Sequence, residues 1–403
     1  MIPALLLMMA PAVTFHADVE PILQRRCQVC HRTGEIGPVS LMTYAEVKPL
    51  ARAVRQAVET KRMPPWGSAE GGPFANHPEL TEAERATITA WVEAGAKEGN
   101  RKEAPPPARW SPGWGMARPG MVLTAPSVFA VPAKGEVESQ VMILPSYLLE
   151  DRWVTAAEIR PGSRSVVHHI VAYVREPGSE WLKEVPRGQY VAWDGAPAQA
   201  DILAVYTPGQ TPFQAPAGMA KKLPAGSDLV LVIHYIADGQ REKDQTSIGL
   251  TFASAPPQKR VLTLQVSPAN FRIPAGAARY GVMAEAALPC DALVLSLFPH
   301  MHRRGKAFQY EVEGANGHME KLVNVPAYKF NWQMNYVLAE PRLLKKGTRL
   351  RATAWFDNSA GNAWNPDPSK EVVSGERNGG EGLAGYFDVA VDAGLERAAQ
   401  ALR

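Results

Sequence analysis

A proline-rich, charged segment divides this chain of 403 residues into two parts of different character. Residues 101–113, RKEAPPPARWSPG, have the composition of a linker. Before it, residues 13–100 carry apolar residues at helical spacing, and Thr81 followed by Glu84 predicts a capping box at a helix start. After it, short apolar runs alternate with turns rich in Pro, Gly, Asn and Asp. We therefore expect a small helical module followed by an all-β region.

The β-rich region, residues 114–403, is too long for a single sandwich of about 100 residues. The proline-rich stretch Ala255-Pro256-Pro257 offers a seam within it. The predicted fold is therefore multidomain, with a small all-α domain at 13–100 and two all-β, jelly-roll-like sandwiches at 114–257 and 258–403.

Charge and hydropathy limit the partners that this chain can have. The formal net charge is +3 and no Lys/Arg block occurs, so we expect no nucleic acid. Residues 1–12 are apolar and end in Ala10-Pro11-Ala12, which is typical of a signal peptide and its cleavage site, although a basic start is missing. An ordinary apolar N-terminus is the alternative. No other stretch is long enough to span a bilayer, so we expect an exported protein, periplasmic or extracellular.

The sequence Cys27-Gln28-Val29-Cys30-His31 is a C-x-x-C-H motif, which is typical of c-type haem attachment. Two thiols at this spacing can add to the vinyl groups of haem, and the imidazole then lies beneath the iron. A zinc site would need a second Cys/His pair nearby, and a dithiol redox pair would need a βαβ context. The motif therefore favours haem c, with Cys27 and Cys30 as attachment points and His31 as an axial ligand.

Met63, which precedes two prolines, is the candidate for the sixth iron position, because a thioether raises the potential of a His-ligated haem. His77 or water is the alternative. Residues 14–98 resemble a small class I cytochrome c domain: a helix runs into the motif, a methionine follows on a loop, and a helix ends the domain. The resemblance implies that Pro38 helps to orient His31.

Five histidines of the β-rich region stand at or near the ends of predicted strands. His300 and His302 are two residues apart, so on a strand they share a face and can reach one metal, copper or zinc. A surface pair without metal is the alternative. His168 and His169 are adjacent and would face opposite sides of a regular strand, so a shared site needs a strand end or a bulge. His234 alone would be a core histidine.

Together these histidines follow the order His-His, His-Tyr, His-x-His. This order resembles the copper type II, ascorbate-dependent monooxygenases, the family of peptidylglycine α-hydroxylating monooxygenase and dopamine β-monooxygenase. The segments 206–209 (YTPG) and 299–306 (PHMHRRGK) support the resemblance, which covers about residues 115–395.

The resemblance implies one copper in each sandwich, with a solvent-filled cleft between them. The electron-transfer copper would take three ligands: His168, His169 and His234. The copper at which oxygen and substrate react would take His300 and His302, together with a methionine.

The sequence departs from this family at the methionine. The stretch expected to carry it is Gly380-Glu381-Gly382-Leu383, in which Gly382 supplies no ligand. Met334 and Glu381 are the possible substitute ligands. The disulfides of the family are also absent, since the only cysteine outside the haem motif is Cys290.

The sequence thus predicts an exported oxidoreductase with haem c and copper as cofactors. Its haem would replace ascorbate, receive electrons from a donor protein or small reductant, and support hydroxylation of a small-molecule or peptide substrate. The missing methionine favours an alternative, an electron-transfer cytochrome on a copper-binding or partner-docking scaffold without oxygenase activity. A third possibility is that the sandwiches form a structural or ligand-binding module.

Overall fold

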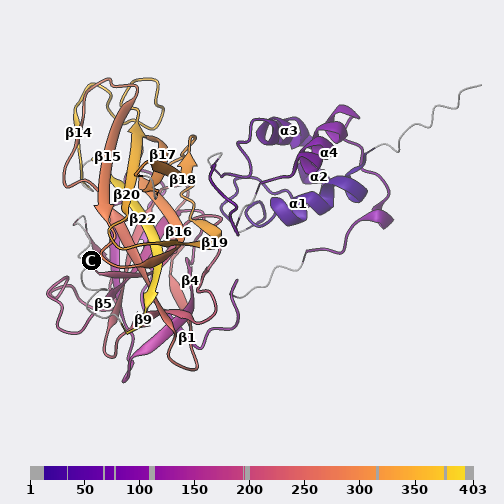
Figure 1. The fold of residues 1–403 in the computed structure, drawn as a ribbon. Helices are drawn as coiled ribbons and strands as arrows, with labels where there is room; N and C mark the ends of the chain where they lie inside the picture. Colours follow the sequence, from indigo (N-terminus) through magenta and orange to yellow (C-terminus); the bar gives the residue numbers. More distant parts are fainter. Residues whose placement is uncertain are drawn as a thin grey trace, which may run out of the picture. The chain divides into compact units, whose positions relative to one another are not determined.

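The fold is mostly β-sheet, with a few short helices near the N-terminus (Figure 1). The computed structural model describes residues 13–33, 35–66, 69–76, 79–108, 114–193, 195, 200–314, 317–375 and 379–394. The predicted signal peptide, residues 1–12, and residues 109–113 of the expected linker lie outside the described residues. Among the described residues, no helix is long and apolar enough to cross a membrane.

The helices are short, and capping boxes begin two of them. Thr81 and Glu84 form the capping box that the sequence predicts, and Thr43 and Glu46 form another. Pro49 lies in a single 3₁₀ turn that separates two α-helical segments. The elements are η1 (Phe15–Val19), α1 (Glu20–Arg26), α2 (Tyr44–Val47), η2 (Lys48–Leu50), α3 (Ala51–Glu59), α4 (Glu82–Glu93) and η3 (Arg101–Glu103).

The strands begin after the proline-rich segment. Strand β20 alternates between buried and more exposed residues, as expected for a sheet with one covered face, whereas β5 and β10 are buried almost throughout. The strands are β1 (Met121–Thr124), β2 (Phe129–Val131), β3 (Gln140–Pro145), β4 (Arg152–Arg160), β5 (Val167–Arg175), β6 (Val191–Ala192), β7 (Asp201–Tyr206), β8 (Phe213–Gln214), β9 (Met219–Leu223), β10 (Asp228–Tyr235), β11 (Glu242–Asp244), β12 (Ser247–Phe252), β13 (Lys259–Val266), β14 (Arg272–Ile273), β15 (Tyr280–Ala287), β16 (Ala292–Met301), β17 (Gly305–Glu313), β18 (Met319–Val325), β19 (Tyr336–Leu344), β20 (Arg349–Phe356), β21 (Val372–Val373) and β22 (Leu383–Asp392).

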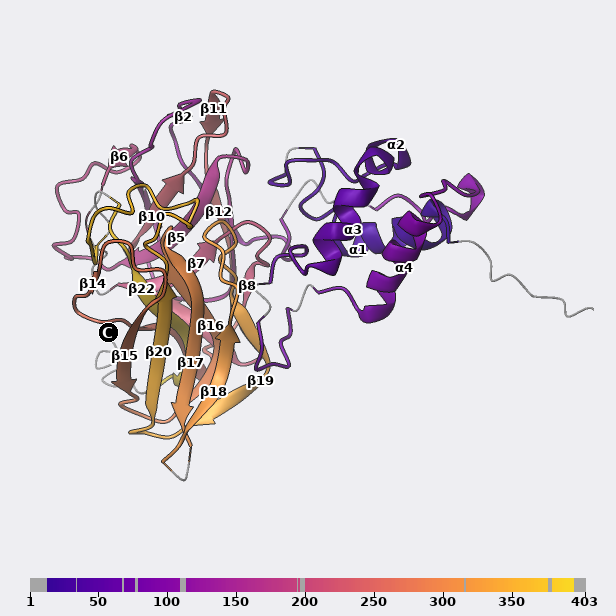
Figure 2. The same cartoon turned by 90° about the horizontal axis from the view of Figure 1, so that it is seen from above.

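Three larger sheets build the β region. The longest has the order β1-β12-β4-β9-β13-β22-β16-β19, and the second has the order β6-β3-β10-β5-β7. The third has the order β15-β20-β17-β18, and Figure 2 shows these four strands side by side. Strand β22 packs closely against the third sheet at Gly385, where an added Cβ would lie 2.9 Å from the Cβ of Ala352. A short parallel pairing of β9 with β13 joins the two halves of the longest sheet, so the predicted seam at 255–257 does not interrupt it.

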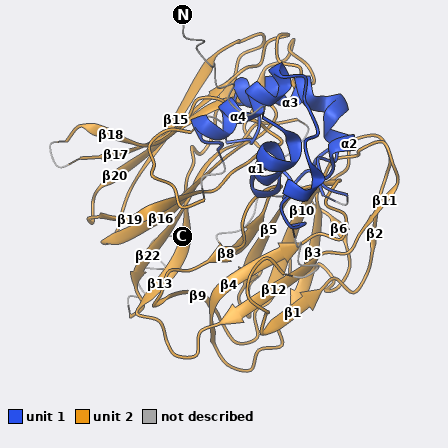
Figure 3. Cartoon of the chain, turned by 90° about the vertical axis from the view of Figure 1, so that its right-hand side faces the viewer, with its two compact units in different colours: residues 1–66, 78–110 blue, residues 67–77, 111–403 orange. Residues whose placement is uncertain are grey.

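The chain divides into two compact units: residues 1–66 with 78–110, and residues 67–77 with 111–403 (Figure 3). The helices therefore form one unit and the strands another, as the change in sequence pattern at the proline-rich segment suggests. One stretch differs from the expectation, because residues 67–77, which the sequence places in the helical module, belong to the β unit.

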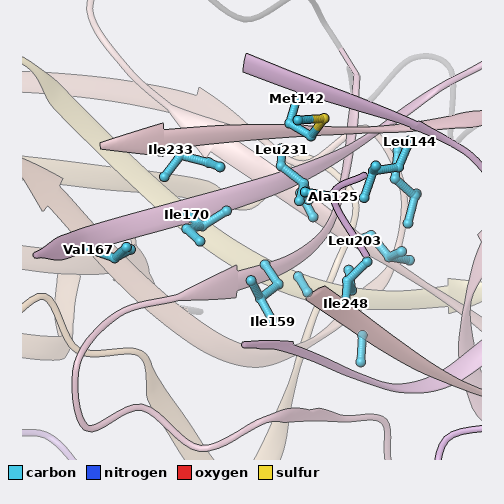
Figure 4. Close-up of a cluster of buried hydrophobic side chains, with 14 of the residues drawn as sticks. Ala125, Met142, Leu144, Ile159, Val167, Ile170, Leu203, Leu231, Ile233 and Ile248 are labelled. Carbon is cyan, nitrogen blue, oxygen red and sulfur yellow. The ribbon is translucent and has the colours of Figure 1, made fainter. Parts of the chain in front are cut away.

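Buried aliphatic side chains from both facing sheets fill the first sandwich. Figure 4 shows this core, to which Ile159 and Ile248 come from the long sheet and Ile170, Leu203 and Leu231 from the second sheet. A separate core holds the helical unit together, with Phe15, Ile88 and Trp91 fully buried in it. Each unit thus has its own apolar core, which is the basis for treating them as separate domains.

Leu231 tests the core of the first sandwich. Its side chain is fully buried, and Leu231→Ala should lower the free energy of unfolding of the β unit by about 3 kcal/mol, because it removes apolar contacts and leaves a cavity. The matched control is Leu149→Ala, since Leu149 is 98% exposed. Urea denaturation followed by circular dichroism measures both, and equal effects of the two changes would contradict the assignment of this core.

Candidate metal and haem sites

The C-x-x-C-H motif lies directly after α1, in a turn whose polar groups are well paired. The amides of Cys30 and His31 both donate to the carbonyl of Cys27, at 3.1 and 2.9 Å. The Nδ1 atom of His31 lies 3.0 Å from the carbonyl oxygen of Val39. Because a carbonyl only accepts, Nδ1 carries the hydrogen, and Nε2 keeps the lone pair that an axial ligand needs.

Gly37 lets the following turn approach the motif. An added Cβ at Gly37 would lie 2.6 Å from the carbonyl oxygen of Cys30 and 2.8 Å from Nδ1 of His31, so no other residue fits there without a shift. The Gly37 amide donates to the same Cys30 oxygen at 2.9 Å. The carbonyl that contacts His31 thus belongs to Val39, the residue after Pro38. That Pro38 helps to orient His31 stays a prediction.

The other predicted haem residues lie in the same unit. Cys27 and Cys30 are both half-buried. Burial, reinforced by Cys30 and Glu84, raises the pKa of the Cys27 thiol to about 12, so it is protonated. Met63 is half-buried after α3, and its amide donates to the carbonyl of Ala57 at 3.0 Å. Met63 as the sixth ligand stays a prediction.

A β-bulge turns two adjacent histidines toward each other. In the antiparallel pair β5–β10, His234 lies opposite His169, and Tyr235 lies opposite Val167, so His168 is the extra residue of the bulge. The Nδ1 atoms of His168 and His169 are 2.9 Å apart. The irregularity that a shared site requires is therefore present.

All five histidines lie in one cluster. The ring centroids of His169 and His234 are 4.1 Å apart, those of His168 and His169 5.1 Å, and those of His300 and His302 5.3 Å. The rings of His169 and His300 connect the two groups at 5.4 Å. The family resemblance implies two sites across a solvent-filled cleft; here the histidines of the two sandwiches contact each other directly.

Hydrogen bonds to backbone carbonyls fix the tautomers of two of these rings. Nε2 of His168 lies 3.0 Å from the carbonyl oxygen of Phe330, and Nδ1 of His302 lies 3.1 Å from that of Gly380. Because both partners only accept, His168 keeps its lone pair on Nδ1 and His302 on Nε2. Each nitrogen with a lone pair is the one that can bind a metal.

A buried glutamine fixes the tautomer of His300. The Gln333 Oε1 atom is 2.7 Å from Nδ1 of His300, and its Nε2 atom donates to the Phe330 carbonyl at 3.3 Å. The amide orientation follows from these two contacts, so Nδ1 of His300 is the donor and Nε2 holds the lone pair. Phe330 thus contacts the first histidine group and, through Gln333, the second.

The fourth partner is a hydroxyl group. Ser139 Oγ lies 3.0 Å from Nδ1 of His234, and either atom can donate in this pair. The four partners Ser139, Phe330, Gln333 and Gly380 were not found from the sequence, because a serine, a glutamine and two backbone carbonyls form no recognisable pattern.

Burial keeps the first two imidazoles neutral. It is the main reason that the pKa of His168 falls to about 3, and that the pKa of His169 lies well below its usual range. Neighbouring histidines lower both values further. Neutral imidazole is the form that binds metal ions.

The cluster is closed on itself rather than arranged around an ion. In the described part of the chain, no three His, Cys, Asp or Glu side chains have, as they stand, the spacing of a metal site. The donor chemistry nevertheless fits copper or zinc, which imidazoles bind well. The 2.9 Å contact between the Nδ1 atoms of His168 and His169 is a hydrogen bond that His169 donates, because His168 holds its lone pair on Nδ1; a metal ion bound by both atoms would replace that hydrogen.

Gly382 faces the Nε2 atom of His302. An added Cβ at Gly382 would lie 3.1 Å from His302 Nε2. A side chain at this position would therefore start beside the second histidine pair, which is where the family resemblance implies a methionine. Glycine leaves that place without a thioether.

The two possible substitute ligands have other surroundings. Glu381 is fully buried, and its carboxylate accepts the amides of His302 at 3.0 Å and Arg304 at 2.7 Å. The Arg304 guanidinium lies 3.7 Å from the same carboxylate. Glu381 therefore positions the backbone at His302. Met334 is buried next to Gln333.

Comparisons with known proteins add no function. No family model and no curated protein matches the sequence. Among solved structures, the chain is similar to the VP2 subviral particle of infectious bursal disease virus, with 8% identity and a TM-score of 0.20 over 72% of this chain and 76% of that chain. Pro-11S globulin of pumpkin gives 8% identity and a TM-score of 0.15 over 63% of this chain and 78% of that chain. Such low scores carry no argument, so function must be argued from the site.

Glu381 provides a test of how the second histidine pair is held. Glu381→Gln should lower the free energy of unfolding by about 3 kcal/mol, because it breaks a buried ion pair and places an N–H group against backbone donors. The control is Glu371→Gln, which removes an exposed ion pair with Arg272 and should cost less than about 1 kcal/mol. Thermal unfolding measures both variants. A Glu381 variant as stable as the control would show that this carboxylate does not hold the His302 backbone.

Proposed function

We propose that this chain is a haem- and copper-dependent oxidoreductase, in which a c-type haem supplies single electrons to copper held by the histidine cluster. The substrate would be hydroxylated with oxygen, as in the monooxygenase family that the sequence resembles. The observation that carries the proposal is the convergence of five histidines, from both sandwiches, in a chain that also has a C-x-x-C-H motif.

The residues divide the work as follows. Cys27 and Cys30 would attach the haem, and His31 would bind its iron through Nε2. Copper would supply one-electron chemistry and oxygen activation in the cluster. The ligands of the first copper would be His168, His169 and His234, and those of the second would be His300 and His302.

The hydrogen-bond partners support this division. His168 presents Nδ1, whereas His300 and His302 present Nε2, because their other nitrogens are taken by Phe330, Gln333 and Gly380. These contacts hold each ring in one orientation and one tautomer, which metal-binding histidines generally need. The buried carboxylate of Glu381 holds the backbone of His302 in place.

The proposal extends to location and partners. The apolar start of the chain favours export, to the periplasm or the exterior. An electron donor protein or a small reductant would reduce the haem, and the substrate would be a small molecule or a peptide.

Anaerobic reduction tests whether haem and copper exchange electrons. Protein that carries oxidised haem and copper(II) receives one reducing equivalent per chain, while haem absorbance and the copper(II) EPR signal are followed. We expect the absorbance of oxidised haem and the copper(II) EPR signal to fall together, because the electron distributes between the two metals. A haem that stays reduced beside unchanged copper(II) would contradict the proposal.

The matched control for this test is a pair of double variants. His168→Ala/His169→Ala and His300→Ala/His302→Ala should each remove part of the copper signal, whereas His318→Ala should remove none, because His318 lies in an exposed turn outside the cluster. Copper bound equally by all three proteins would instead favour a structural or ligand-binding role for the sandwiches.

Gly382 favours a second candidate function, electron transfer or copper binding without oxygenation. A soft thioether stabilises copper(I), the oxidation state that binds oxygen, and glycine at position 382 supplies none. The second copper would then have only two protein ligands, His300 and His302. A hydroxylated product that forms only with both copper and oxygen would exclude this candidate.

Gly382→Met tests that explanation directly. The backbone at Gly382 lies outside the left-handed region, and an added Cβ would lie 3.1 Å from His302 Nε2, so a methionine fits beside the second histidine pair once the His302 ring shifts by a few tenths of an ångström. We expect the copper(I) affinity to rise about tenfold, or ~1.4 kcal/mol. Gly382→Leu is the control of similar size without sulfur. Equal copper(I) affinities of the two variants, measured by competition with a chromophoric chelator, would contradict a role for this position.

A further inference from the structure

Strand β16 extends beyond one of its two neighbouring strands before it reaches the second histidine pair. Its pairing with β19 ends at Leu297, whereas its pairing with β22 continues to Met301. In the described part of the chain, the last residues of β16 therefore have no partner strand on the β19 side. Met301 lies in this part of the strand, between His300 and His302, and it is fully buried.

A tyrosine hydroxyl takes the place of the missing strand. The amide of Met301 donates to the hydroxyl oxygen of Tyr328 at 3.0 Å, and the same hydroxyl donates to the carbonyl of Met301 at 2.8 Å. A hydroxyl group can accept and donate at once, so one side chain satisfies both backbone groups of Met301. Buried backbone groups need such partners, because burial without a hydrogen bond costs free energy.

The two hydrogen bonds of Tyr328 fix both peptide groups between the histidines. The Met301 amide belongs to the peptide that joins His300 to Met301, and the Met301 carbonyl belongs to the peptide that joins Met301 to His302. With both peptide planes held, the backbone that carries the two rings is held in its observed conformation. The rings then lie with their centroids 5.3 Å apart and with an angle of 78° between their planes.

Tyr328 is itself held by the β unit. It is buried, and its amide donates to the carbonyl of Lys306, on β17, at 2.9 Å. Burial, reinforced by the Glu381 carboxylate, raises the pKa of the Tyr328 hydroxyl well above its usual range. The hydroxyl therefore keeps the hydrogen that it donates to Met301.

The other contacts of this pair act at single points. Gln333 and Gly380 each hold one ring, at 2.7 and 3.1 Å, and Glu381 accepts the amide of His302 at 3.0 Å. Tyr328 differs from these three residues because it contacts both peptides that link the two rings.

The conformation of this backbone matters because the second pair offers few ligands. A methionine is missing at Gly382, so in the proposed function the protein ligands of the second copper are His300 and His302. The two Nε2 atoms must then face one ion at a suitable angle, and no third protein ligand compensates for an error in their placement. Groups outside the ligand set commonly raise metal affinity by holding the ligands in orientation.

We propose that Tyr328 is a positioning residue for the second histidine pair, and that its hydroxyl sets the angle at which His300 and His302 present their Nε2 atoms to copper. The inference rests on the proposed function, which assigns these two rings to the second copper. Sequence reasoning did not find Tyr328, because a tyrosine in the connection between β18 and β19 forms no pattern with a histidine pair on β16.

Tyr328→Phe tests this role, because it removes one oxygen atom and keeps the ring. Copper(II)-loaded protein is studied by EPR, and the spectrum of the second copper is obtained by subtracting that of His300→Ala/His302→Ala. We expect the parallel hyperfine splitting of the second copper to change. We also expect its copper(II) affinity, measured by competition with a chelator, to fall at least tenfold, because the two Nε2 atoms lose their fixed angle.

The matched control is Tyr310→Phe. Tyr310 is also buried in the β unit, and its hydroxyl donates to the carbonyl of Tyr386, on β22, at 2.9 Å. If Tyr328 served stability alone, both variants would unfold more easily and neither would change the copper signal. Equal copper affinities and equal EPR spectra of the two variants would therefore overturn the inference.

A measurement on the unchanged chain covers the case in which Tyr328→Phe does not fold. Hydrogen exchange at the Met301 amide of copper-free protein should be as slow as in the β16–β22 ladder, because the hydroxyl holds this peptide before copper binds. Fast exchange there would overturn the inference and leave the proposed function standing. Identical EPR spectra of the wild-type protein and His300→Ala/His302→Ala would instead overturn the proposed function for this pair, and the inference with it.

Discussion

The β-bulge at His168 is the constraint on which the candidate site depends. A regular ladder between β5 and β10 would send His168 and His169 to opposite faces. The bulge brings their Nδ1 atoms to 2.9 Å and leaves His169 stacked on His234 at 4.1 Å. The first sandwich thereby places three imidazoles where His300, from the second sandwich, can meet them.

Buried imidazoles must be paired, and the second sandwich supplies partners for three of the five rings. An unpaired polar group in this environment would cost about 1–3 kcal/mol. In one turn, the Phe330 carbonyl accepts a hydrogen bond from His168 and the Gln333 side chain accepts one from His300. The adjacent residues Gly380 and Glu381 accept hydrogen bonds from the ring and the amide of His302. The cluster is therefore a point at which the two sandwiches hold each other, and a change at Gln333 should disturb both histidine groups.

The sequence was sufficient for features that are local or periodic. The capping box at Thr81, the change from helical to strand patterns, and the projection of His300 and His302 from the end of one strand follow from spacing alone. The need for a strand end or a bulge at His168 also follows, because adjacent residues alternate on a strand. The expectation that Gly382 stands beside the second histidine pair came from family resemblance, and the contact with His302 agrees with it.

Other features depend on contacts between distant residues, which leave no period in the sequence. The pairing of β9 with β13, the role of Gln333 as a partner of His300, and the direct contact of His169 with His300 are of this kind. Residues 69–76 were expected in the helical module, because nothing in their composition shows that Gly71 and Asn76 fit the edges of two sheets. Fold alone does not decide the chemistry, so the haem and the copper remain proposals about residues whose placement is now known.

The amount of iron and copper bound per chain tests the central claim most directly. Exported, haem-loaded protein is saturated with copper, desalted and measured by elemental analysis. Two coppers for each haem iron are expected, because each histidine group contains rings whose tautomer is fixed by hydrogen bonds, His168 in the first group and His300 and His302 in the second. A chain that binds haem but retains no copper would contradict the claim that the five-histidine cluster is a metal site.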